Sequence, residues 1–259
     1  MDAGFQFQLG VFTGGFTPNT SNMTEWVSHW APAQTTAYNS TTKSFTSDFI
    51  VTHNVSPFVV GAKGYIWGRK TTALDSEWIL MRSTNWTWPS PDPTGMSPFN
   101  LNWNFPLANE VLLGSVHSSG SPFLMKSEMI ESYDQWKNSK LAGALLDGPN
   151  HDPDQDGRSN LVEFAFGTLP LQADSVSSET ADLTGVSGEK YLQITVPRIR
   201  NHLAAVSVEV SGDLQNWYSG TGHMVEVENT PDFLIVRDLT PFGPGMPRRF
   251  MRAKAEIPP

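Results

Sequence analysis

Phe5-Gln-Phe-Gln-Leu-Gly-Val11 alternates large apolar residues with polar or small ones. A period of two is typical of a β-strand with one buried face. The same alternation returns in Leu192–Val196 and Val206–Val210. Only 17% of the residues are charged, while 21 Gly and 19 Pro supply turns, so short strands joined by tight loops are favoured over long helices. We therefore predict a mainly β fold.

The 259 residues are enough for more than one compact domain. Residues 1–125 contain several strand patterns, among them Glu77–Arg82, and are predicted to form a β-sandwich or jelly-roll. Residues 126–172 are predicted to form a short EF-hand-like helix-loop-helix. Residues 173–259 are predicted to be a linker followed by a small fibronectin-like β-sandwich.

Two helices are expected in the middle segment. Ser127–Leu141 places apolar residues near a helical stripe, with Ser127 as its N-cap. Asn160–Phe166 is predicted to be the second helix, ending at Gly167. The loop between them is the most informative stretch of the chain.

The net charge of −9 is concentrated in this segment, because residues 126–180 hold ten acidic and four basic side chains, a net of −6. No basic stripe is present, which excludes nucleic acid as an expected partner. No run of 18 apolar residues is present, so no membrane span is predicted. The absence of cysteine excludes disulfides, thiolate metal sites and cysteine nucleophiles.

The stretch Asp152–Glu163 matches a calcium-binding loop of the EF-hand type. Such a loop needs oxygen ligands at positions 1, 3, 5, 7, 9 and 12 and a glycine at position 6, which is Gly157 here. Four carboxylates within twelve residues repel one another unless a cation lies between them. The expected ligands are Asp152, Asp154, Asp156, the backbone carbonyl of Arg158, Asn160 directly or through water, and Glu163 in bidentate fashion.

We predict Ca²⁺ as the bound ion, because Mg²⁺ prefers fewer protein ligands in rigid octahedral geometry. The loop lies between two β-rich halves, so calcium is expected to order the acidic segment and to fix the halves relative to each other. Sites of this kind in extracellular modules bind at roughly 10⁻⁴–10⁻³ M, which favours an exported protein over a cytosolic one.

The loop and the residues after it, Asp152–Pro170, resemble the single calcium motif of many secreted proteins of the Planctomycetes and Verrucomicrobia. They are also similar to dockerin and thrombospondin type 3 loops, although Glu163 stands where those loops usually have Asp. The resemblance continues through Val206–Trp217 and Pro247–Arg252 into a small β domain. It implies export and a surface or extracellular location, but no defined activity.

Three aromatic residues, Trp86, Trp88 and Trp103, allow two interpretations. If exposed, they form a face that stacks on sugar rings; if buried, they fill the core, as large aromatics usually do. The strand Phe5–Val11 likewise either offers a free edge to a neighbouring subunit or pairs inside its own domain.

An uncharacterised hydrolase is a third possibility. Glu25, Glu77 and Glu110 are available as a carboxylate pair, and His117 is followed by Ser118, but no spacing favours catalysis. We therefore predict a secreted or cell-surface, non-catalytic, calcium-stabilised structural protein whose signal peptide has been removed. Self-association through strand edges and binding of a surface glycan are its candidate interactions.

Overall fold

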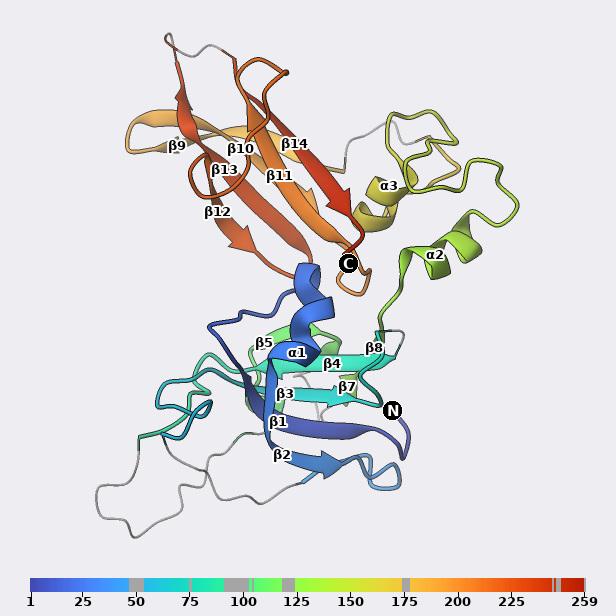
Figure 1. The fold of residues 1–259 in the computed structure, drawn as a ribbon, viewed down its shortest axis with the longest axis vertical. Helices are drawn as coiled ribbons and strands as arrows, with labels where there is room; N and C mark the ends of the chain where they lie inside the picture. The colour runs from blue at the N-terminus through green and yellow to red at the C-terminus, as the bar shows by residue number, and fades with distance from the viewer. Residues whose placement is uncertain are drawn as a thin grey trace. The chain divides into compact units, whose positions relative to one another are not determined.

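The computed structural model describes residues 1–46, 54–74, 76–90, 103, 105–117, 124–173, 178–243, 245 and 248–258. It divides into two compact units, Met1–Ile130 and Glu131–Pro259. Strands make up 42% of the chain and helices 12%, and all pairs of named strands are antiparallel (Figure 1). The prediction of a mainly β fold is confirmed.

The first unit is built around one sheet with the strand order β2-β1-β3-β4-β5, to which β8 adds by pairing with β4. A small hairpin of β6 and β7 accompanies it. The strands are β1 (Gln6–Phe12), β2 (Trp30–Ala37), β3 (Gly64–Arg69), β4 (Glu77–Arg82), β5 (Glu110–Leu113), β6 (Ser115–His117), β7 (Leu124–Lys126) and β8 (Glu128–Met129).

Strand β1 lies inside this sheet. Leu9 faces Gln34 of β2 on one side and Ile66 of β3 on the other. The backbone of β1 is thus paired on both sides, and the alternative in which Phe5–Val11 offers a free edge to another subunit is wrong.

The two faces of the sheet bury different side chains. One face packs Phe5 and Phe7, which the alternation predicts to be buried, together with Ile79 of β4. The other face is covered by a 3₁₀ helix, η1 (Thr20–Glu25), and by α1 (Trp26–His29). Trp26 stacks on Trp78 at 6.0 Å between ring centroids, so tryptophan dominates this side of the core.

The second unit contains a four-stranded sheet of order β12-β13-β10-β9 and a two-stranded sheet of β11 and β14. Val196, Val208 and Val236, from three different strands, belong to one apolar core between these sheets. The strands are β9 (Thr180–Val186), β10 (Glu189–Pro197), β11 (Ala205–Ser211), β12 (Met224–Asn229), β13 (Phe233–Phe242) and β14 (Phe250–Glu256).

Helices α2 (Tyr133–Lys140) and α3 (Asn160–Phe166) belong to the same core. Trp136 of α2 and Phe164 of α3 are buried together with the valines of the two sheets. Helices of eight and seven residues are too short to be stable alone, so they depend on this packing. Residues 131–172 of the predicted module 126–172 therefore belong to the second unit, while residues 126–130 belong to the first.

The start of α2 differs from the prediction. Ser132 is its N-cap, and the Gln135 side chain accepts from the Ser132 backbone N–H while the Ser132 hydroxyl accepts from the Gln135 N–H. This capping box fixes the helix start five residues after Ser127, and Met129 lies in β8 instead. The expected end of α3 is confirmed, because Gly167 adopts φ 81° there.

Candidate metal centre

The acidic loop leaves α2 through residues 141–151 and returns into α3. Its two ends are tied by backbone hydrogen bonds, from Asn160 N–H to the His151 carbonyl at 2.8 Å and from Leu161 N–H to the Pro149 carbonyl at 3.0 Å. The first turn of α3 is thereby held beside the beginning of the loop. Residues 152–159 must consequently fold back within a short distance.

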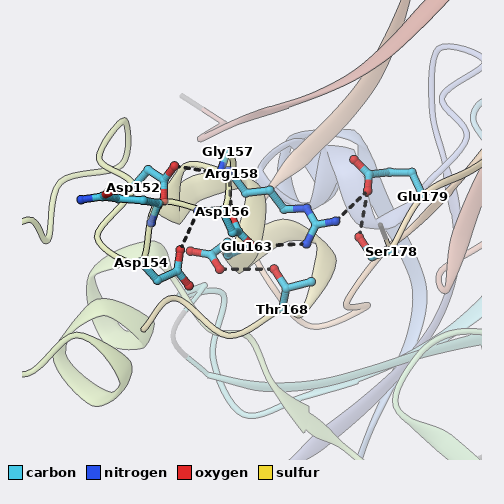
Figure 2. Close-up of polar contacts among 10 residues, drawn as sticks. Asp152, Asp154, Asp156, Gly157, Arg158, Glu163, Thr168, Ser178 and Glu179 are labelled. Carbon is cyan, nitrogen blue, oxygen red and sulfur yellow. Dashed lines mark hydrogen bonds and ion pairs between the residues drawn. The ribbon is translucent and has the colours of Figure 1, made fainter. Parts of the chain in front are cut away.

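Local polar contacts shape this return. The Asp152 carboxylate accepts from the backbone N–H groups of Gln155 at 2.8 Å and Gly157 at 2.9 Å. Gly157 adopts φ 93°, which a residue with a side chain rarely does, and this explains the glycine at the sixth position of the motif. Figure 2 shows Asp152, Asp154 and Asp156 around this turn.

The three aspartates form one cluster. Each offers a carboxylate oxygen, and these oxygens all lie within 4.8 Å of one another. Oδ2 of Asp154 is buried and makes no hydrogen bond within the described part of the chain. Burial, together with the charges of Asp156 and Asp152, raises the pKa of Asp154 above its usual value.

The cluster of three aspartate carboxylates favours binding of a cation. The donors are all carboxylate oxygens, and one buried oxygen has no other partner, so the three aspartates could hold a metal ion. The prediction of a metal site at positions 1, 3 and 5 of the loop therefore agrees with the geometry. A hard divalent ion matches this donor set best.

Glu163 is fully buried on α3 but lies outside the group of three. Its Oε1 accepts a long hydrogen bond of 3.5 Å from the Thr168 hydroxyl, beyond the end of the helix (Figure 2). Position 12 of the motif thus supplies a carboxylate held inside the unit.

Arg158 does more than the sequence suggested. The motif assigned only its backbone carbonyl, whereas its guanidinium lies 3.6 Å from Asp156 and 3.6 Å from Glu179, next to the start of β9 (Figure 2). The positive charge of this guanidinium offsets part of the negative charge of the carboxylates in the loop. Glu179 was missed because nothing in the local pattern links a residue 21 positions away to the loop.

Asn160 holds the loop in place. Its side-chain amide donates to the carbonyls of Leu146 at 2.9 Å and Gly148 at 2.8 Å, and the residue is fully buried. Its Oδ1 is also buried and accepts no hydrogen bond from the described residues. The structure therefore gives Asn160 a role in closing the loop that the ligand spacing alone does not reveal.

The tryptophans proposed for a glycan face are mostly inside the first unit. Trp88 is 1% exposed and Trp86 4% exposed, so the interpretation as an exposed aromatic face is wrong for both. Trp103 stacks on Trp86 at 5.7 Å and meets Trp88 edge-on at 5.3 Å. Trp86 and Trp103 border a cavity of about 360 Å³.

The glutamates considered for hydrolysis have separate partners. Glu77 accepts from Ser127 at 2.8 Å, Glu110 lies 3.4 Å from Arg82, and Glu25 lies 3.9 Å from His29. Ser118 is outside the described residues, and so is the side chain of His117. No helix in the described ranges is long and apolar enough to cross a membrane.

Comparison of the chain with protein-family models, with curated proteins and with solved structures finds no match.

Proposed function

We propose that the protein is a calcium-stabilised, non-catalytic structural protein of the cell surface or extracellular space. The observation that carries the proposal is the group of three carboxylates from Asp152, Asp154 and Asp156, whose oxygens lie within 4.8 Å. The loop spacing and the resemblance of Asp152–Pro170 to the calcium motif of secreted bacterial proteins support the same interpretation.

Calcium is favoured over magnesium by the number of oxygens that the loop offers. The expected ligands approach the six to eight oxygens that Ca²⁺ takes. They are the three aspartates, the carbonyl of Arg158, Asn160 directly or through water, and the carboxylate of Glu163. Mg²⁺ usually keeps several waters and uses one or two carboxylates. The twelve-residue spacing therefore suits the larger ion.

The role that we propose for the ion is structural. The loop connects α2 and α3, whose side chains Trp136 and Phe164 are part of the core of the second unit. An ion that binds only the folded loop stabilises that core by mass action, by about 2.7 kcal/mol at a concentration 100 times its Kd. The extracellular calcium concentration is high enough to fill a weak site. The exported protein is therefore stabilised by the ion in the compartment where it works.

Isothermal titration of the chelator-treated protein with CaCl₂ tests the site. We expect one ion to bind with a Kd of roughly 10⁻⁴–10⁻³ M or tighter, and MgCl₂ to bind more weakly. Asp154→Asn removes a charge from the cluster and is expected to weaken calcium binding by about tenfold or more.

Asp182→Asn provides the matched control, because it makes the same chemical change at an exposed position of β9 in the same unit. It should bind calcium like the unchanged protein. Failure of the unchanged protein to bind calcium, or equal binding by Asp154→Asn, would contradict the proposal.

A further inference from the structure

A cavity of the first unit has three aromatic residues in its lining. It has a volume of about 640 Å³, within the range of roughly 300–1,000 Å³ that small-molecule sites occupy. Phe12, Phe16 and Tyr65 contribute to its lining. Phe12 meets Tyr65 edge-on at 5.2 Å between ring centroids and lies tilted against Phe16 at 5.6 Å, so the rings form one continuous group.

One wall of the cavity is a tight turn that presents backbone donors. The turn is closed by the hydrogen bond from Phe16 N–H to the Thr13 carbonyl at 3.1 Å, and Gly14 and Gly15 have φ 66° and 72°. The N–H groups of these two glycines donate to no group in the described part of the chain. Both residues are exposed and line the cavity.

Lys63 adds a positive charge to the same cavity. Its side chain is exposed and forms no ion pair or hydrogen bond with any other described residue. An ammonium that has no acidic partner among the described residues, in the same cavity as unused backbone N–H groups, attracts a carboxylate or another anion. Aromatic rings bind the C–H face of a sugar as they bind other apolar surface.

The cavity beside Trp86 and Trp103 lacks these features. None of the described residues that line it is basic, and the side chain of Asn109, one of two asparagines in the lining, already bonds with Thr84 at 2.9 and 3.0 Å. The aromatic cavity with Lys63 is consequently the better site for a charged ligand.

We propose that the cavity lined by Phe12, Phe16, Tyr65, Gly14, Gly15 and Lys63 binds an acidic sugar residue of the hexuronate type. The partly exposed rings of Phe12 and Phe16 pack on the sugar ring, and the buried Tyr65 supports Phe12 from behind. Lys63 and the two backbone N–H groups hold the carboxylate. This site lies in the first unit and the metal loop lies in the second. Binding of the sugar therefore does not depend on whether the loop in the second unit binds calcium.

Titration with trigalacturonate, in excess chelator, tests this site against the fully methyl-esterified trimer as a neutral probe. We expect the acid to bind at least about tenfold more tightly than the ester, because the ester lacks the charge that Lys63 recognises. Lys63→Gln should weaken binding of the acid about tenfold and leave binding of the ester unchanged. Phe16→Ala should weaken both.

Lys190→Gln is the matched control, since it removes the same charge from an exposed position of β10 in the other unit. Its affinity for the acid should equal that of the unchanged protein, and near-ultraviolet circular dichroism shows whether each variant is folded. Equal affinities for acid and ester, an unchanged affinity in folded Lys63→Gln, or no binding at about 10 mM probe would overturn the proposal.

Discussion

At the scale of single residues, the three aspartates and Asn160 show which contacts the spacing of the loop predicts and which it does not. The spacing predicted Asp152, Asp154 and Asp156 as neighbours, and their oxygens do come together. The spacing predicts Asn160 as a ligand through its side-chain oxygen, and its amide nitrogen in addition donates to the carbonyls of Leu146 and Gly148. Those partners lie in an irregular loop, whose path depends on packing and not on local pattern.

Replacement of Asn160 tests this holding role. Asn160→Ala leaves two carbonyls without their donor and should reduce the free energy of unfolding of the second unit by roughly 2–4 kcal/mol. Chemical denaturation in excess chelator measures the effect without any contribution from a bound ion. Asn138→Ala, at an exposed position of α2, is the control and should change stability by less than about 0.5 kcal/mol. A similar loss of stability in both variants would contradict the role.

At the scale of elements, alternating strands and the end of α3 were predictable because each depends on nearby residues. The start of α2 was misplaced at Ser127, although the capping box of Ser132 and Gln135 is also a local signal. Tertiary contacts set the path of the chain before Ser132. The segment before α2 is drawn into the second unit by Glu131, whose N–H donates to the Asn201 carbonyl and whose carbonyl accepts from Leu203. This non-local pairing ends the strand-like path and lets the helix begin only afterwards.

The contact between Glu131 and His202 makes a pH dependence expected. His202 Nε2 lies 3.0 Å from Glu131, and the imidazole stacks on Phe164 at 4.4 Å. Burial lowers the pKa of His202 below its usual value, although the hydrogen bond to the Phe164 carbonyl and Glu131 oppose the shift. Because the unfolded chain takes up the proton first, the second unit should lose stability as the pH falls below about 6.5.

Denaturation of His202→Gln at pH 7.5 and 5.5 measures this dependence. The variant should lose less stability than the unchanged protein between the two pH values. His223→Gln, at an exposed histidine in the same unit, should keep the dependence of the unchanged protein. An unaltered dependence in His202→Gln would show that another group is responsible.

At the scale of the whole molecule, the main correction concerns where the metal loop belongs. The sequence placed it as a connection between two β-rich halves, since the excess acidic charge lies in the middle. The structure includes it in the second unit, because α2 and α3 bury Trp136 and Phe164 in the core of the C-terminal sheets. A core shared by residues far apart in sequence cannot be deduced from charge or period. Fixing of the two units by calcium stays a prediction.

Scanning calorimetry of the whole chain, in about 5 mM CaCl₂ and in excess chelator, tests the central claim most directly. Calcium should raise the unfolding temperature of the second unit by roughly 5–10 °C, because the ion binds only its folded loop. The unfolding of the first unit should stay the same, and Asp154→Asn should remove the shift. Equal unfolding temperatures for the second unit, with and without calcium, would contradict the claim that the loop is a stabilising calcium site.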